Sequence, residues 1–467
     1  MPSLEKIREY AETVGDQIRW EKARPRVSEE IENHVTDTRD AYVAQGLDED
    51  AATDMAIADT GDAAVIGLEL DRIHRPKPQW GMLAATVVLL LLGILVRLFV
   101  FNDEDRVGLL SFRLFHTGIG IVAMFVAYFA DFTLVGRFPK TVYFGLIAAA
   151  GVVSFLSPNW YGTPFYTQYI VLLFPVAYVA IIFAARNKGY KGIILCGLAY
   201  IVPGAVAVSV TFVSVSLLFT VVGVALLCLA ICKNWFGVKK GYGLLLVLVP
   251  TVLVAVVLFA GMEVLGPNRL TTALHPELAP QGAGYMGVMA RRLLDGAVFF
   301  GQGNIPSEYI VILREPASFF YTDMLLTALI SLMGWSVLIV VFGAIGFFVI
   351  KGFKSCFKQK SGLGFLVSMA IMLTFTLQVI GYVVYNLGFQ LIPPISLPLI
   401  SYGNAATATN LLLIGLMLSV FRTGDIAVDG IFTRTKKRVR RLSWADGKLT
   451  IDFRLSKNRF FEKWTSR

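Results

Sequence analysis

A series of apolar stretches, each long enough to cross a membrane, constrains the fold of this chain more than any other feature. A hydrocarbon core about 30 Å thick needs roughly 20 predominantly apolar residues in helical conformation. Hydrophobic residues make up 56% of the 467 residues and charged residues only 16%, a balance typical of membrane proteins. We predict an all-α, polytopic membrane protein. Its ten transmembrane helices are expected near residues 81-101, 109-131, 141-157, 165-185, 192-212, 214-232, 242-264, 324-350, 363-386 and 404-421.

The distribution of Lys and Arg among the connecting loops predicts the orientation of these helices, because basic residues accumulate on the cytoplasmic side. The loops near 103-106 and 158-164 carry no excess of basic residues, whereas the alternate loops do. An even number of helices then places both termini in the cytoplasm and the loops 266-322 and 388-402 outside. The basic residues assigned to the cytoplasmic side are Arg137, Lys140, Arg186, Lys188, Lys191, Lys233, Lys239, Lys240, Lys351, Lys354, Lys358, Lys360, Arg434, Lys436, Lys437, Arg438, Arg440 and Arg441.

Three regions of different composition divide the chain. Residues 1-78 are polar, and residues 1-80 hold 18 Asp and Glu against 10 Lys and Arg, which predicts a small cytoplasmic helical domain. Residues 79-424 form the predicted transmembrane domain, with the large extracellular loop 266-322. Residues 425-467 form a basic cytoplasmic tail. No apolar signal-peptide region is expected at the N-terminus.

The first domain is predicted to contain four amphipathic helices that end at Gly46, Gly61 and Pro76. Ser28 stands ahead of several glutamates, a capping-box pattern that predicts the start of a helix. The arrangement resembles the permease-prefix domain found ahead of some bacterial membrane proteins, and a generic helical tail is the alternative. Both interpretations make it an interaction or regulatory module rather than a catalytic one.

Neither a metal site nor a disulfide is expected. The four histidines stand singly, without the spacing of metal ligands. The four cysteines lie in apolar segments or in a Lys-rich loop, so we expect them to stay reduced. The formal charge of +9 is explained by the cytoplasmic loops, and no nucleic-acid motif accompanies it.

The two outer loops contain the motifs that relate this chain to a known family. The first includes Arg269, the pair Gly284-Tyr285 and the triplet Gly301-Gln302-Gly303, and it ends at Thr322-Asp323. The second contains Leu397-Pro-Leu-Ile-Ser-Tyr-Gly403 ahead of the last helix. In these motifs, in the ten helices and in the large loop between helices seven and eight, the chain resembles the SEDS family, the group of FtsW, RodA and SpoVE.

The resemblance implies a peptidoglycan glycosyltransferase that polymerises lipid II into glycan strands on the outer face of the bacterial cytoplasmic membrane. Asp323 falls on the catalytic Asp of the family, and Glu315 on a Glu that many members carry eight residues earlier. The Asp would accept the proton of a sugar 4-hydroxyl while that oxygen attacks the anomeric carbon of a second lipid-linked disaccharide. A carboxylate shielded from water has a raised pKa, which suits a base working near neutral pH.

The leaving polyprenyl diphosphate needs positive charge, which arginines or a divalent cation (Mg²⁺ or Mn²⁺) could supply; no other cofactor is expected. The implied partners are lipid II, membrane lipid and a class B penicillin-binding protein, with no nucleic acid. The residues predicted to support the reaction or to bind the substrate are Glu315, Thr322, Arg269, Arg291, Arg292, Arg314, Tyr285, Gln302, Ser401 and Tyr402.

Several of these residues also have a purely structural interpretation. Asp323, at the start of an apolar helix, could serve as its N-cap. The pair Arg291-Arg292 could extend toward lipid headgroups from an interfacial helix. The Gly301-Gly303 triplet could be a flexible turn. The loop from Pro393-Pro394 to Pro398 could be a rigid re-entrant lid, and we expect the cavity that it lines to be the substrate site.

Three functions are therefore carried forward, in order of preference. The glycosyltransferase requires Asp323. A transporter or flippase of lipid-linked precursors would move its substrate without forming polymer, although the inverted repeats and broken helix pairs of many transporters are not evident. A non-catalytic scaffold of the cell-wall synthesis complex would act through residues 1-75 and would tolerate the loss of Asp323.

Overall fold

The fold is almost entirely helical. The computed structural model describes residues 2–21, 23–76, 78–100, 106–160, 163–210, 213–265, 269–314, 322–401, 403–424, 441–445 and 448–452. Two small antiparallel hairpins accompany the helices in these ranges: β1 (Asn159–Trp160) with β2 (Thr163–Pro164), and β3 (Arg441–Ala445) with β4 (Lys448–Asp452).

Four helices form the N-terminal domain: α1 (Pro2–Asp16), α2 (Arg24–Ala44), α3 (Glu49–Thr60) and α4 (Ala63–His74). Buried apolar side chains from three of them meet in one cluster of Ile7, Val35 and Ala56. Asp48 caps α3 by accepting a hydrogen bond from Asp50 N. The helix start predicted at Ser28 is wrong, because α2 begins at Arg24, where a proline in the first turn already favours helical geometry.

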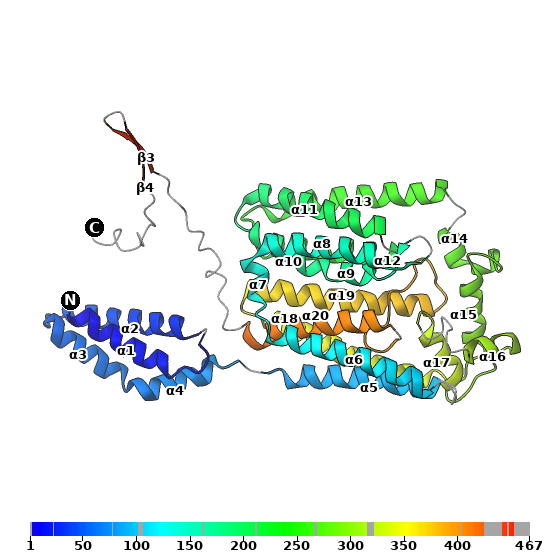
Figure 1. Cartoon of the computed structure of the whole chain (residues 1–467), viewed down its shortest axis with the longest axis horizontal. Helices are drawn as coiled ribbons and strands as arrows, with labels where there is room; N and C mark the ends of the chain where they lie inside the picture. The colour runs from blue at the N-terminus through cyan, green and yellow to red at the C-terminus, as the bar shows by residue number, and fades with distance from the viewer. Residues whose placement is uncertain are drawn as a thin grey trace. The chain divides into compact units, whose positions relative to one another are not determined.

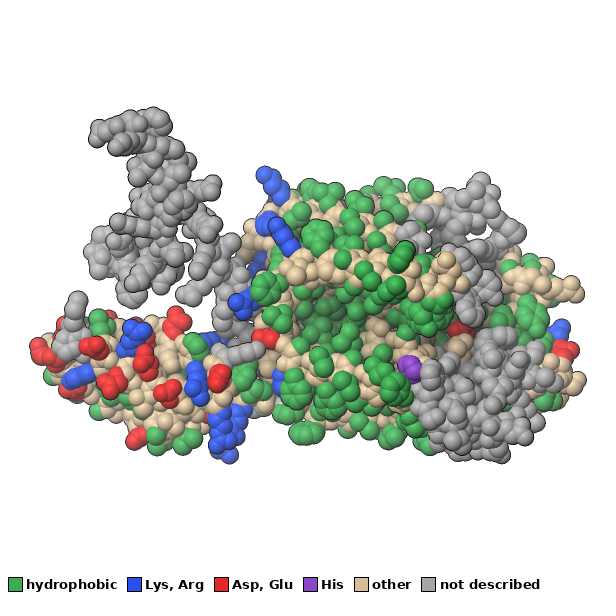
Figure 2. All heavy atoms as spheres, viewed as in Figure 1, with side chains coloured by type: hydrophobic (Ala, Val, Ile, Leu, Met, Phe, Trp, Pro, Cys, Tyr) green, Lys and Arg blue, Asp and Glu red, His purple; other side chains and the backbone are tan. Residues whose placement is uncertain are grey.

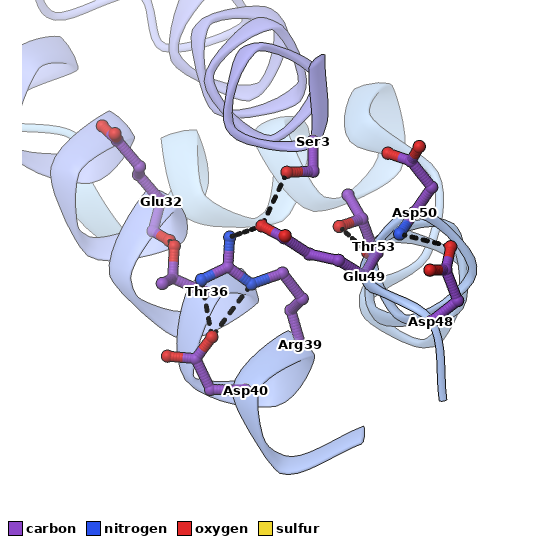
Figure 3. A network of polar contacts seen from close by, with 9 residues as sticks. All are labelled: Ser3, Glu32, Thr36, Arg39, Asp40, Asp48, Glu49, Asp50 and Thr53. Carbon is purple, nitrogen blue, oxygen red and sulfur yellow. Dashed lines mark hydrogen bonds and ion pairs between the residues drawn. The ribbon is translucent and has the colours of Figure 1, made fainter. Parts of the chain in front are cut away.

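A polar network ties three of these helices together (Figure 3). The Arg39 side chain is only 11% exposed and pairs with Asp40 at 2.5 Å. A guanidinium nitrogen of Arg39 also lies 3.8 Å from the Glu49 carboxylate on α3. Ser3 on α1 donates a hydrogen bond of 3.0 Å to the same carboxylate. Ionic contacts therefore supplement the small apolar core of this domain.

The membrane region is a stack of long, nearly parallel helices, with a cluster of shorter ones at one end (Figure 1). Eight helices in the described residues have the length and apolarity to cross a membrane, and Trp80–Val96 and Leu114–Phe129 are two shorter apolar helices. Each of the ten predicted spans thus contains a helix. The helices are α5 (Trp80–Val100), α6 (Arg106–Phe129), α7 (Thr133–Arg137), α8 (Pro139–Leu156), α9 (Thr167–Val171), α10 (Phe174–Ala184), α11 (Gly189–Val210), α12 (Val213–Cys232), α13 (Lys240–Leu265), α14 (Arg269–Leu274), α15 (Tyr285–Asp295), α16 (Ser307–Arg314), α17 (Leu325–Met333), α18 (Ser336–Phe357), α19 (Gly362–Asn386) and α20 (Asn404–Thr423).

The span predicted over 324-350 is broken at a glycine. The helix expected over 324-350 divides into α17 and α18 at Gly334, which has a φ of 86°. Glycine adopts this left-handed conformation without steric cost. A passing segment satisfies the backbone at the break, since Trp335 N donates to Val298 O at 3.0 Å. The prediction of one continuous helix here is therefore wrong.

Small residues let α6 and α20 pack closely. A methyl group built on Gly415 would lie 2.2 Å from Met124 O, and one on Gly120 would lie 3.1 Å from Ala408 Cα. Ser419 adds a hydrogen bond of 2.5 Å to Ala130 O. Close backbone approach through small residues is a common way to pack helices in membranes.

Substituting Gly415 with Ala is expected to destabilise the membrane region by about 1–3 kcal/mol, because a backbone carbonyl cannot move aside for the added methyl group. The measurement is the midpoint of thermal unfolding of the full chain in detergent. Gly118→Ala on α6 is the matched control, since a methyl group there meets no atom within 4 Å. Equal midpoints for the two variants would contradict the close α6–α20 contact.

Charge is distributed unevenly over the membrane region. Figure 2 shows Lys and Arg side chains gathered at the end that carries α7, together with a hollow lined by hydrophobic side chains on the same face. The cluster of short helices α14 to α17 lies at the opposite end. The two ends of the helical stack therefore differ in chemical character.

Candidate active site

Asp323 lies at the start of α17 in a largely apolar setting. The segment that carries it, 322–324, connects to a helix whose residues Leu325 and Ala328 are buried. Asp323 itself is half-buried. Burial raises the pKa of its carboxyl group to about 6, although a hydrogen bond from the Thr322 side chain opposes the shift. A carboxyl group with this pKa is ionised near neutral pH and can accept a proton efficiently there.

Tyr382 on α19 holds the backbone on both sides of Asp323. Its hydroxyl group donates a hydrogen bond of 2.7 Å to Thr322 O. The same hydroxyl group accepts one of 3.1 Å from Leu325 N. Because its side chain is fully buried, water does not compete for these two bonds.

Asn386, one turn further along α19, holds the next backbone groups. Its Nδ2 donates to Asp323 O at 2.8 Å, and its Oδ1 accepts from Thr327 N at 3.1 Å. The second Nδ2 proton is donated to Tyr382 O at 2.9 Å. We refer to Tyr382 and Asn386 as the α19 clasp.

The hydrogen bonds of the α19 clasp test whether Asp323 serves as the N-cap of α17. Met324 occupies the N-cap position of α17, and no side-chain capping bond is present there. The amides of Leu325 and Thr327 bond instead to the clasp. The interpretation of Asp323 as an N-cap is therefore wrong, and its carboxylate is not needed to satisfy the helix.

Three tyrosine side chains lie near the carboxyl group. Tyr169 on α9, Tyr382 and Tyr385 all lie within electrostatic range of Asp323. Thr167, on the same short helix as Tyr169, is fully buried, and its Oγ1 has no hydrogen-bond partner. Burial beside these tyrosine side chains shields the Asp323 carboxyl group from water.

The two adjacent arginines of the outer loop, both on α15, are ion-paired. Arg291 contacts Glu277 at 3.3 Å and donates to Leu274 O at 2.8 Å. Arg292 contacts Glu308 at 3.2 Å. A diphosphate would have to compete with these carboxylates for the two guanidinium groups.

A cavity lies between the two outer loops. It has a volume of about 240 Å³, and its lining includes Thr272, Gly287, Gly388 and Gln390. The Nε2 atom of Gln390 is buried without a hydrogen-bond partner. The start of the Pro-rich loop therefore lines a cavity, and Asp323 is not among the lining residues. That this cavity is the substrate site stays a prediction.

The second half of the Pro-rich loop is buried in protein. Leu397, Leu399 and Ile400 are at most 2% exposed, and Leu399 has a φ of 66°. Ser401 is also buried and accepts a hydrogen bond of 2.9 Å from Leu397 N. The Ser401 hydroxyl group, predicted to contact substrate, thus holds this turn.

The Gly301–Gly303 triplet is paired rather than free. Gly301 N donates to Met333 O at 3.1 Å, and Gly303 N donates to Ser331 O at 2.9 Å. Gln302 between them is exposed, and Tyr285 at the start of α15 is 41% exposed. Backbone hydrogen bonds thus join the triplet to the end of α17.

Some predicted site residues lie outside the described residues. Glu315 and Tyr402 belong to this group, as do the side chains of Arg269 and Arg314, although both arginines begin or end a described helix. Within the described ranges, no three His, Cys, Asp or Glu residues come together in a way that could hold a metal ion. A divalent cation that travels with the diphosphate stays a prediction.

Sequence reasoning missed the α19 clasp. The available signal was a row of polar residues in an otherwise apolar helix, with Gln378, Tyr382 and Asn386 four residues apart. This spacing places them on one helix face, and polar groups within a membrane helix are costly unless they have a function or a partner. Gln378 bonds to Asn410 on α20 at 3.2 Å.

Comparison with known protein sequences finds a distant relative. No family model matches the chain. A curated relative, a probable peptidoglycan glycosyltransferase FtsW of Idiomarina loihiensis, is 24% identical over 176 residues, which cover 36% of this chain and 42% of that protein. The match thus spans less than half the length of that relative.

Solved structures extend the comparison to most of the chain. A chain of a peptidoglycan synthase complex, described as coordinating polymerisation and crosslinking, superposes with a TM-score of 0.57 and 17% identity, over 74% of this chain and 98% of that chain. A crystal structure of the rod-shape-determining protein RodA of Thermus thermophilus gives a TM-score of 0.49 at 14% identity, over 74% and 97%. The first superposition confirms the fold: this is a polytopic helical membrane protein with the SEDS fold.

Proposed function

We propose that this chain with a SEDS fold is a peptidoglycan glycosyltransferase that polymerises lipid II, the undecaprenyl-diphosphate-linked disaccharide peptide. The observation that carries the proposal is the carboxyl group of Asp323, half-buried with its pKa raised to about 6 and free of any capping role. The FtsW-like relative and the synthase-complex superposition support this reaction class.

In the proposed reaction, the Asp323 carboxylate accepts the proton of the 4-hydroxyl group of one disaccharide. The hydroxyl oxygen forms a bond to the anomeric carbon of a second lipid-linked disaccharide. The bond between that carbon and the phosphate oxygen breaks, and undecaprenyl diphosphate leaves with the electron pair. Apolar surroundings strengthen these electrostatic interactions by excluding water.

The outer-loop arginines would neutralise the negative charge of the leaving diphosphate. Arg291 and Arg292 would exchange Glu277 and Glu308 for the diphosphate, and Arg269 and Arg314 belong to the same predicted set. A divalent cation bound with the diphosphate is the alternative source of this positive charge.

We infer that the end with Lys and Arg, near α7, faces the cytoplasm and that both termini lie there (Figure 2). The opposite end, with α14 to α17 and Asp323, then faces outward, where lipid-linked precursors are polymerised. By analogy with the synthase complex, the partner is a class B penicillin-binding protein that crosslinks the new strands.

The purified wild-type chain is expected to convert labelled lipid II into glycan strands, alone or with a class B penicillin-binding protein. Because Asp323 must be ionised, the rate should rise with pH through an inflection near 6 and level off above it. The measurement is gel separation of labelled glycan between pH 5 and pH 8.

Two other outcomes would redirect the proposal. Movement of labelled lipid II across proteoliposome membranes without polymer would favour the flippase. Absence of both activities, combined with stimulation of a separate polymerase by the chain, would favour the scaffold.

A further inference from the structure

The α19 clasp contacts four backbone groups around Asp323 and leaves its carboxyl group untouched. Tyr382 bonds to Thr322 O and Leu325 N, so it spans the residue from both sides. Asn386 bonds to Asp323 O itself and to an amide in the first turn of α17. The carbonyl on either side of the Asp323 Cα thus has a fixed donor.

The clasp is itself rigidly held. Tyr382 is 0% exposed and Asn386 is 1% exposed. The Asn386 amide uses both Nδ2 protons, one for Asp323 O and one for Tyr382 O. Thr327 Oγ1 closes the arrangement with a bond of 2.8 Å to Asn386 O. Buried networks in which every member is satisfied specify one geometry strongly.

We propose that Tyr382 and Asn386 are positioning residues that fix the direction in which the Asp323 carboxylate points toward the attacking hydroxyl group. This inference rests on the proposed function. Neither residue exchanges a proton with substrate; each acts through the backbone that carries the base. Rate depends steeply on such placement, because a displacement of about 1 Å can cost a hundredfold.

The main test replaces Tyr382 with Phe, which removes one hydroxyl group and keeps the ring. We expect kcat to fall about ten- to hundredfold with KM changed less than about threefold. The pH inflection should move below about 6, because a loosened segment admits water and water lowers the pKa of the carboxyl group. Asn386→Leu should act in the same direction.

Matched controls separate positioning from the general loss of a buried hydrogen bond. Tyr178→Phe removes a buried hydroxyl group on α10 that donates to Cys196 O at 3.2 Å. Asn410→Leu removes a buried amide on α20 that bonds to Gln378. Both controls should keep the wild-type kcat and the wild-type pH inflection.

Hydrogen exchange supplies a readout that does not need activity. Peptides that contain Leu325 and Thr327 should exchange faster in Tyr382→Phe than in the wild type, while peptides of α10 stay unchanged. Wild-type kcat and pH inflection in Tyr382→Phe would overturn the positioning role, as would an equal loss in Tyr178→Phe. Unchanged exchange at these amides would overturn the clasp itself.

The same experiments distinguish a failure of the glycosyltransferase proposal from a failure of the positioning role. If the wild type makes no glycan under any partner condition while exchange still rises in Tyr382→Phe, the clasp holds the segment but its role in glycosyl transfer is overturned together with the enzyme. If the wild type is active and only the clasp variants lose rate and shift their pH inflection, both proposals are supported.

Discussion

Asp323→Asn is expected to lower the rate of glycan polymerisation by about 10²–10⁴-fold, the usual contribution of a general base. Asn has nearly the shape of Asp but cannot accept the proton of the attacking hydroxyl group. The hydrogen bonds of the α19 clasp go to the backbone around this residue and not to its side chain. The substitution should therefore remove the base and leave the fold intact.

The measurement is the initial rate of lipid II polymerisation at pH 7.5, with lipid II binding measured separately. Asp295→Asn is the matched control, since Asp295 is an exposed carboxylate on the neighbouring outer helix α15. Full activity of Asp323→Asn would remove the basis of the enzymatic proposal, whereas loss of activity in both variants would point to a general effect of outer-loop charge.

Asp323→Asn should lose activity but not folding stability. The pKa of Asp323 is about 6 in the folded protein against an ordinary value of 3.8, so the folded state binds the proton more tightly than the unfolded state. Folding stability therefore falls as pH rises from about 4 to about 6. Asp323→Asn lacks this fall and should be at least as stable as the wild type at pH 7.

The arrangement of membrane helices could be predicted from the sequence because it depends mainly on apolar length. Even the closely spaced helices α11 and α12 were predicted as two helices, over 192-212 and 214-232, although α12 already begins at Val213. The break at Gly334 was missed, because apolar residues continue without interruption across it. Hydrogen bonds to a segment more than thirty residues earlier in the chain stabilise that break. The residues next to the break give no sign of these contacts.

Local signals failed in a similar way at Ser28. The residues there match the capping-box pattern, but the helix begins one turn earlier, where Pro25 favours the first helical turn. In the site, Asp323 was found through a motif, whereas the clasp comes from residues about 60 positions away. Only the fold brings α17 and α19 together, so motif reasoning finds the base but not the groups that hold it.

The sequence analysis also missed a buried carboxylate that stabilises the N-terminal domain. Asp71 on α4 is 0% exposed. It accepts hydrogen bonds from Arg19 N at 2.9 Å and from the Arg75 side chain at 2.7 Å. Burial raises the pKa of this carboxyl group, but these hydrogen bonds and the two positive charges outweigh burial and hold the pKa below its ordinary value.

Asp71→Ala is expected to lower the free energy of unfolding of the N-terminal domain by about 2–3 kcal/mol, because the Arg19 amide loses its buried acceptor. Removing one partner of a fully buried ion pair costs about 3–5 kcal/mol, and the smaller figure applies since Arg19 and Arg75 are partly exposed and regain water. The measurement is hydrogen exchange of peptides within residues 2–76 of the full chain. Asp54→Asn is the control, because its ion pair with Lys6 is exposed to solvent and such pairs contribute little to stability.

The pH dependence provides an independent check on Asp71. Its folded-state pKa lies below the ordinary value of 3.8, so its contribution is fully present above that value and is lost as pH falls through the folded-state pKa. Exchange in the wild-type domain should therefore accelerate below about pH 4 more than exchange in Asp71→Ala. Parallel pH dependences in the two proteins would show that the carboxylate of Asp71 does not stabilise the domain through these arginines.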